Sequence, residues 1–177
     1  MAVKYKLPPI DDILTLSSPE QAAILDSLFE PSPLLHELCL PSLGRYKFSN
    51  YDELIAFVGR LLNDLFESGK TTQLDEVLVS HPRLGATSVQ SSQSQGEQSQ
   101  LQSSDSRESE KLTQMNAIYE HNFPGLRYVT FVDGRQRGAL LEDMQRRVDR
   151  FDINAERSDA LRAICDIASD RARKLSN

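Results

Sequence analysis

The sequence predicts an all-α protein: a compact single domain, residues 1–177, built as a helical bundle of about seven or eight helices. Two observations predict this class. Helix start signals and apolar residues at intervals of three and four positions recur along nearly the whole chain. Only the segment 128–132 is β-branched and aromatic throughout, and a single strand would have no partner, so we expect a buried extended connector there.

The first two predicted helices each begin at a serine followed by proline. Ser18 is the predicted N-cap of the first helix, with Pro19 in the first helical position and Gln21 as the capping-box residue. Ser32-Pro33 repeats the signal, and Pro41 is predicted to end this second, shorter helix.

Two further helices are predicted before residue 80. Ser49 or Asn50 should cap a long helix that ends at Ser68-Gly69, because glycine is common just after a helix C-terminus. One or two helical turns should follow and stop at Ser80-His81-Pro82. The apolar positions of both helices are Leu54, Phe57, Val58, Leu61, Leu62, Leu65, Leu74, Val77 and Leu78.

Three more apolar stripes at helical spacing follow in the second half. The first ends near Phe123-Pro124-Gly125, and the second reaches Phe151 after a predicted turn at Asp133-Gly134-Arg135. Asn154 is the predicted N-cap of the last helix. The stripes consist of Leu112, Met115, Ile118 and Tyr119, of Leu140, Leu141, Met144 and Val148, and of Leu161, Ile164, Cys165, Ala168, Ala172 and Leu175.

A Ser/Gln-rich segment at residues 88–106 interrupts this pattern, with fourteen serines and glutamines among its nineteen residues. Composition alone predicts a flexible linker, because such a segment cannot bury apolar area. A linker would divide the chain into halves that are each marginal for independent folding. The spacing of Glu97, Gln98 and Leu101 also permits a polar helix.

Composition argues against several classes of partner. The chain has 20 basic and 26 acidic residues and a net charge of −6, which argues against general binding to nucleic acid or to an anionic membrane. No apolar run approaches the roughly 20 residues that a membrane span requires. Cys39 and Cys165 fit neither a disulfide framework nor a zinc ligand set. We therefore expect an intracellular protein without a metal.

His81 is the candidate for acid–base chemistry among three histidines. It lies where a helical pattern stops, and Pro82 restricts its backbone to an extended conformation. Imidazole has a reference pKa of about 6.5, and rigid placement is what a general acid or base needs. The alternative is a solvated histidine at a helix end; His36 and His121 are both expected to be structural.

Glu97 and Gln98 could complete such a site. A carboxylate within reach of an imidazole can raise its pKa and fix its tautomer, and an amide offers one acceptor and two donors to a ureido group. Ser94 adds a hydroxyl on the same helix face. One of five arginines could pair with an anionic substrate; these are Arg127, Arg135, Arg137, Arg146 and Arg147.

Four motifs follow one another in a specific order. They are Ser80-His81-Pro82-x-Leu84-Gly85, Ser94-x-x-Glu97-Gln98, Asn116-x-x-Tyr119-Glu120-x-x-Phe123 and Tyr128-Val129-x-x-Val132-x-Gly134-Arg135. Together they resemble the 2-oxo-4-hydroxy-4-carboxy-5-ureidoimidazoline (OHCU) decarboxylase family. Phe29-Glu30-x-Ser32-Pro33 and residues 156–175 are also similar to that family, so the resemblance covers nearly the whole chain. It implies an active-site helix within 88–106 in place of a linker.

The resemblance implies a homodimeric decarboxylase that needs neither a metal nor an organic cofactor. The implied reaction is loss of CO₂ from OHCU to give (S)-allantoin in urate breakdown, a step of purine metabolism. His81 is implied as the catalytic acid or base and Glu97 as its partner. The implied substrate-binding residues are Pro82, Ser94, Gln95, Gly96, Glu97, Gln98, Tyr128, Val129, Thr130, Phe131 and Val132.

Two departures from the family pattern motivate an alternative function. Arg83 stands where an acidic residue is usual, and the stretch after Gln98 is rich in serine and glutamine where the family has alanine. The alternative is a catalytically inactive helical interaction or scaffold module of the same fold. We expect a cytoplasmic or peroxisomal location, although the C-terminal Leu175-Ser176-Asn177 is not a peroxisomal Ser-Lys-Leu signal.

Overall fold

The computed structural model describes residues 5–86, 91–99 and 106–176, and these form helices without a β-strand. The all-α class is therefore confirmed. None of the described helices is both long enough and apolar enough to span a bilayer. The elements are η1 (Ile10–Thr15, a 3₁₀ helix), α1 (Ser18–Phe29), α2 (Pro33–Leu43), α3 (Tyr51–Glu67), α4 (Thr71–Leu78), α5 (Ser92–Gln98), α6 (Ser106–Asn122), α7 (Arg137–Arg150) and α8 (Ile153–Ser176).

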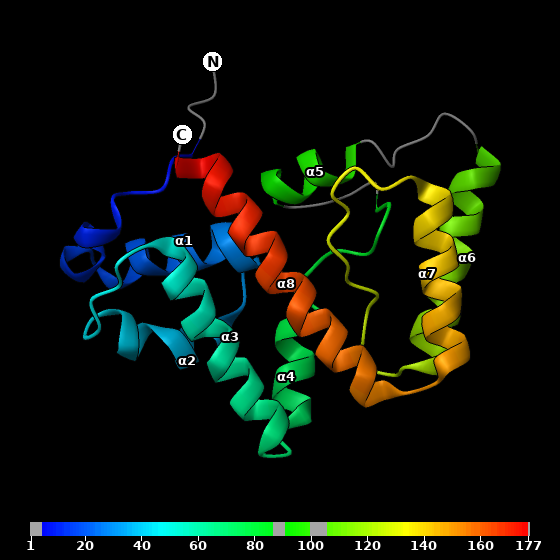
Figure 1. Cartoon of the computed structure of the whole chain (residues 1–177), viewed down its shortest axis with the longest axis horizontal. Helices are drawn as coiled ribbons and strands as arrows, with labels where there is room; N and C mark the ends of the chain where they lie inside the picture. The colour runs from blue at the N-terminus through cyan, green and yellow to red at the C-terminus, as the bar shows by residue number, and fades with distance from the viewer. Residues whose placement is uncertain (1–4, 87–90, 100–105, 177) are drawn as a thin grey trace.

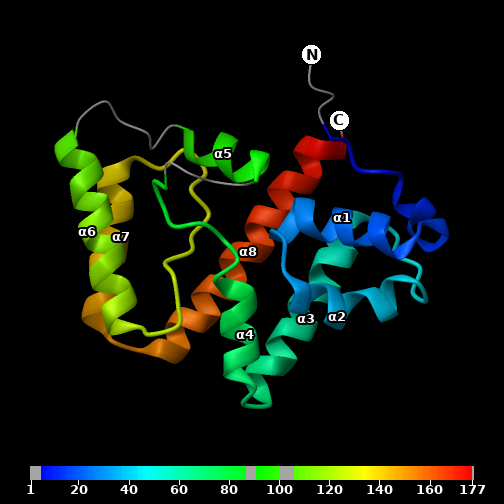
Figure 2. The ribbon, with the colours of Figure 1, turned by 180° about the vertical axis from the view of Figure 1, so that it is seen from behind.

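Helix α8 is the central element of the fold. It runs diagonally through the molecule and packs against α1, α3 and α4 on one side (Figure 1). On the other side α6 packs against α7, and the extended connector between them returns along the length of this pair (Figures 1 and 2). Helix α5 lies across the end of the molecule where α8 finishes. The connector and α5 thereby come to lie beside α8.

Gly59 lets α3 pack closely against α8. A Cβ atom at Gly59 would lie 3.1 Å from the sulfur of Cys165 on α8. Burial raises the pKa of the Cys165 thiol to about 11, so the thiol is protonated and acts as a small apolar group. Both cysteines are free. Leucines at positions 54 and 62 of α3 are fully buried on the same core.

Three of the predicted helix boundaries are wrong. The N-cap of α1 is Ser17, whose N–H and hydroxyl both donate to Glu20 Oε2, at 2.8 Å and 2.6 Å. Pro41 does not end α2, because the helix continues through it to Leu43. Asp152 instead of Asn154 caps α8, since its carboxylate accepts hydrogen bonds from the first two backbone N–H groups of the helix that follow Ile153.

The polar helix within the Ser/Gln-rich segment is confirmed as α5. Ser91 caps it by accepting a hydrogen bond from the Ser94 N–H at 3.3 Å. Ser94 and Gln98, four residues apart, are buried, so one face of this polar helix packs against the protein. The predictions for residues 88–90 and 100–105 lie outside the described residues.

The extended connector predicted at 128–132 is also confirmed. The Tyr128 hydroxyl donates to Asp143 on α7 at 2.5 Å, and the guanidinium of Arg147 lies 4.9 Å from the centre of the Tyr128 ring. Arg135 donates to the Thr130 hydroxyl and to the Phe131 carbonyl. These contacts hold the chain in place where no regular secondary structure does so.

Gly85 offers a test of how tightly the loop after α4 is packed. Its φ of +75° favours glycine, and a Cβ there would lie 2.3 Å from Leu112 Cδ2. We expect Gly85→Ala to lower the free energy of unfolding by about 2–4 kcal/mol, measured by urea denaturation. Gly138→Ala is the matched control, because a Cβ at that helical position meets nothing within 4 Å. Equal stability of wild type and Gly85→Ala would contradict this account of the loop.

Candidate active site

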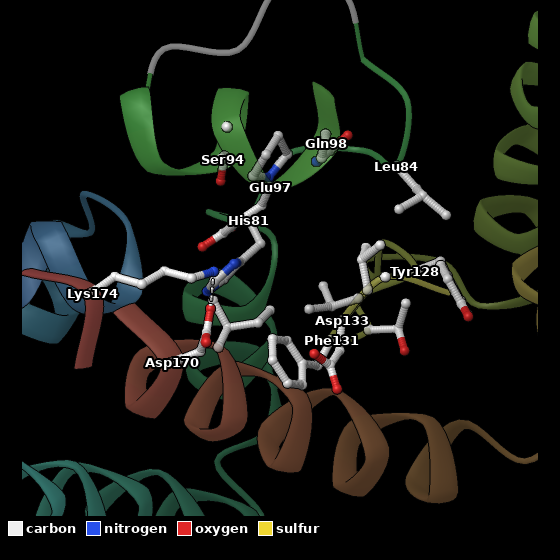
Figure 3. Close-up of a pocket in the computed structure, with 17 residues that line it drawn as sticks. His81, Leu84, Ser94, Glu97, Gln98, Tyr128, Phe131, Asp133, Asp170 and Lys174 are labelled. Carbon is white, nitrogen blue, oxygen red and sulfur yellow. Dashed lines mark hydrogen bonds and ion pairs between the residues drawn. The ribbon is translucent and has the colours of Figure 1, made fainter. Parts of the chain in front are cut away.

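The end of α4, helix α5, the extended connector and α8 surround a cavity of about 220 Å³ (Figure 3). Every residue that the sequence predicted for the site lines it, except Gln95, which is exposed on α5. The lining residues are His81, Pro82, Leu84, Ser94, Gly96, Glu97, Gln98, Tyr128, Val129, Thr130, Phe131, Val132, Asp133, Gly134, Ile167, Asp170 and Lys174.

His81 is held at the end of α4 by contacts from the connector. The guanidinium of Arg127 donates to the carbonyl of Val79 at 2.9 Å and to that of His81 at 3.4 Å. Both carbonyls lie after Leu78, the last residue of α4, where the helix no longer provides a backbone partner. Pro82 follows directly and stiffens the exit from the helix. The backbone of the candidate catalytic histidine is therefore fixed from both sides.

The His81 imidazole is buried and neutral. The residue is 3% exposed, and burial together with the positive charge of Arg171 lowers the pKa of its imidazole to about 3. The ring makes one hydrogen bond, to the backbone of Phe29, while Nε2 is buried without a hydrogen-bond partner. Nδ1–H is thus the donor, and the tautomer leaves the Nε2 lone pair free to accept a proton or a hydrogen bond from a ligand.

A buried cluster around Arg171 lies behind the cavity wall. Arg171 is 1% exposed and bonds both oxygens of Glu97, from Nε at 2.7 Å and from Nη2 at 2.8 Å. Nη2 also lies 2.7 Å from Glu30 Oε1 and 2.9 Å from Ser94 Oγ, and the Ser94 hydroxyl donates to Glu30 at 2.5 Å. This bidentate and charge-assisted network fixes the position of α5 relative to α8.

Glu97 therefore has a different partner from the one that the sequence suggested. Its carboxylate pairs with Arg171, and the orientation of the His81 ring comes from the backbone of Phe29. Gln98 is fixed as well, because its side-chain carbonyl accepts the Gly85 N–H at 2.7 Å. This bond ties α5 to the loop that follows His81 and Pro82.

Sequence reasoning missed three charged residues of α8 at or behind the cavity. Asp170 and Lys174 line the wall, and Arg171 supports it. A signal was present: Arg171 lies between Ala168 and Leu175 at intervals of three and four residues, which places a cation within an apolar stripe. None of the five arginines that we singled out between residues 127 and 147 lines the cavity.

The charge reversal at Arg83 has a structural partner outside the cavity. Its guanidinium donates to both oxygens of Glu120 on α6, at 2.5 Å and 2.8 Å. Arg83 is not among the lining residues. Arg83 therefore adds a contact between the loop and α6 and places no charge on the cavity wall.

Comparison with known proteins identifies the family. The model of the OHCU decarboxylase family matches residues 15–173. The chain belongs to the OHCU decarboxylase family. No curated protein matches the chain.

A solved structure extends the comparison to the fold. The crystal structure of (S)-allantoin synthase is similar, with a TM-score of 0.66 and 23% sequence identity. The match covers 94% of this OHCU decarboxylase family member and 54% of that chain, so our chain spans about half its length. Within the described residues, no three His, Cys, Asp or Glu side chains are grouped as a metal site would require.

The lowered pKa of His81 predicts a specific dependence of stability on pH. Between about pH 3 and 6.5 the unfolded state binds a proton at His81 that the folded state excludes. The contribution of neutral His81 to the free energy of unfolding is therefore fully present above about pH 6.5, and it is lost as the pH falls. Relative to His81→Gln, wild type should lose about 1.4 kcal/mol of unfolding free energy per pH unit below 6.5.

Urea denaturation at a series of pH values between 4.5 and 7.5 measures this difference. Carboxylates common to both proteins cancel in the comparison, so the difference reports on His81. Parallel stability curves for wild type and His81→Gln would show that the imidazole titrates normally in the folded protein.

Proposed function

We propose that this protein converts OHCU to (S)-allantoin and CO₂ in the breakdown of urate. The observation that carries the proposal is His81, which lines a cavity together with the motifs of the family and whose Nε2 has no hydrogen-bond partner. The family name supplies the substrate class, and the similar (S)-allantoin synthase suggests the product. A cavity of about 220 Å³ suits a small heterocycle with a ureido arm.

The substrate supplies its own electron sink. When the bond from C4 to the carboxylate breaks, the electron pair forms a C4=C5 double bond, and the pair of the ring C=N moves to nitrogen, which takes a proton. The resulting enol gains a proton at C5 and loses its hydroxyl proton to become the C4 carbonyl. The protein then has to bind, orient and move protons, which needs no organic cofactor.

His81 is proposed to manage the hydroxyl proton and the proton delivered to C5. Neutral imidazole with a free Nε2 lone pair can accept a hydrogen bond from the substrate hydroxyl. The substrate carboxylate brings negative charge close to the ring and raises the imidazole pKa from its low value in the free protein. His81 can then take the hydroxyl proton and return it to one face of the ring, which gives a single enantiomer.

Glu97, Arg171 and Gln98 are proposed to position the substrate. Arg171 holds the Glu97 carboxylate rigidly at the wall, where it can accept hydrogen bonds from ureido N–H groups. The side-chain carbonyl of Gln98 already accepts a hydrogen bond from the Gly85 N–H. The side-chain amide nitrogen of Gln98 is therefore the group that can donate to a substrate carbonyl. The homodimer implied by the family resemblance stays a prediction, for which light scattering is the measurement.

The first activity prediction concerns His81. Substrate is made fresh from urate by oxidation and ring hydrolysis, and formation of optically active allantoin is followed by circular dichroism. Wild type should accelerate this reaction, and His81→Asn should lose about 10²- to 10⁴-fold in kcat, as expected for a general acid–base residue. His36→Asn is the matched control, since its ring pairs with Asp26 at 2.6 Å and does not line the cavity.

Two outcomes would contradict this prediction. If wild type yields only the slow racemic background, the protein is the inactive helical module. If His81→Asn keeps near-normal turnover, the proton-transfer group lies elsewhere.

The second activity prediction concerns Glu97. Glu97→Gln keeps the shape of the side chain but leaves Arg171 with one carboxylate partner, Glu30. We expect turnover to fall by about 10-fold or more, because misplacement of substrate-orienting groups is costly. If Glu97 and His81 act as a unit, the double variant should be scarcely slower than His81→Asn. Fully multiplicative losses would indicate independent roles.

A further inference from the structure

The cavity wall has an unusual charge balance for a site that takes an anion. Its acidic side chains are Glu97, Asp133 and Asp170. Among the described lining residues, Lys174 is the single lysine or arginine. Since the proposed substrate carries a carboxylate, one cation has to offset both that charge and the nearby carboxylates.

Arg171 is poorly placed to bind that carboxylate. It does not line the cavity, and its charge is already balanced by Glu30 and Glu97. Its N–H groups also meet Ser94 Oγ at 2.9 Å and the Leu28 carbonyl at 3.4 Å. A substrate carboxylate would have to displace these buried partners, which is costly.

Lys174 has the opposite properties. Its side chain is 63% exposed, and it extends from α8 toward the cavity residues, where Nζ lies 2.5 Å from Asp170 Oδ2 (Figure 3). Asp170 is one helical turn earlier and only 15% exposed, so it holds the ammonium beside the wall. An ammonium has three N–H donors, and Asp170 occupies one of them.

We propose that Lys174 binds the carboxylate of the substrate at the mouth of the cavity and thereby selects carboxylate-bearing ureido compounds. This inference rests on the proposed function. The contact favours the bound substrate more than the transition state, because the negative charge leaves the carboxylate as CO₂ forms. Loss of Lys174 should therefore raise KM without lowering kcat.

Calorimetric titration with two ligands tests this assignment without turnover. Allantoate carries ureido groups and a carboxylate, whereas (S)-allantoin is neutral. Lys174→Gln should weaken allantoate binding by about 10-fold, as expected for a partly exposed hydrogen bond to a charged group, and should leave (S)-allantoin binding unchanged. Lys174→Arg should retain most of the allantoate affinity, since it keeps the positive charge.

Lys47→Gln is the matched control. Lys47 is similarly exposed, at 73%, pairs with Asp11 at 3.3 Å and does not line the cavity. It should leave both affinities unaltered. In the decarboxylation assay Lys174→Gln should raise KM by about the same factor of 10 with kcat retained.

Either of two results would overturn the assignment. Equal allantoate affinity in wild type and Lys174→Gln would show that another group binds the carboxylate. A parallel loss of allantoate and allantoin affinity would show that Lys174 only shapes the cavity. Failure of wild type to form optically active allantoin would instead refute the proposed function. The decarboxylation assay measures this outcome separately from the calorimetric titration.

Discussion

The guanidinium of Arg171, 1% exposed, joins three segments that lie far apart in the sequence. It pairs with Glu30 after α1 and with Glu97 on α5, while its own backbone belongs to α8. A buried charge is tolerated only when it is paired and hydrogen-bonded, so each of these segments is required for the others to hold their positions. Helix α5 is seven residues long and largely polar, and it depends on this pairing for its place beside α8.

The same cluster determines the chemistry available at His81. The burial of the ring and the positive charge of Arg171 together lower the imidazole pKa and keep His81 neutral, with Nε2 left without a hydrogen-bond partner. Glu30 holds Arg171 from a strained backbone, because its φ of +72° and ψ of 153° are unusual for a residue with a side chain. Such conformations cost about 1–3 kcal/mol and persist where surrounding contacts determine them. One network therefore both pairs the buried charge of Arg171 and lowers the pKa of His81.

Divergence of the sequence around the site is accommodated by contacts that lie outside the cavity. Arg83 pairs with Glu120, and Arg127 bonds the carbonyls of Val79 and His81. Both arginines strengthen the loop that carries His81 and leave the lining residues as they are. This explains how an unusual composition near the motifs is compatible with an intact arrangement of His81, Glu97 and Gln98.

Local patterns were sufficient for the helices and for the candidate histidine. Apolar spacing of three and four residues, serine and asparagine caps and the proline after His81 depend on neighbours within one or two turns, so they can be read along the chain. The boundaries at Ser17 and Asp152 differ from the expected ones because neighbouring residues compete for each cap, and α2 continues through Pro41 to Leu43. The partner of Glu97, the burial of Arg171 and the position of Lys174 were decided by the tertiary structure. Arg171 and Glu97 are 74 positions apart, and only the packing of α5 on α8 brings the buried guanidinium and the partly buried carboxylate together.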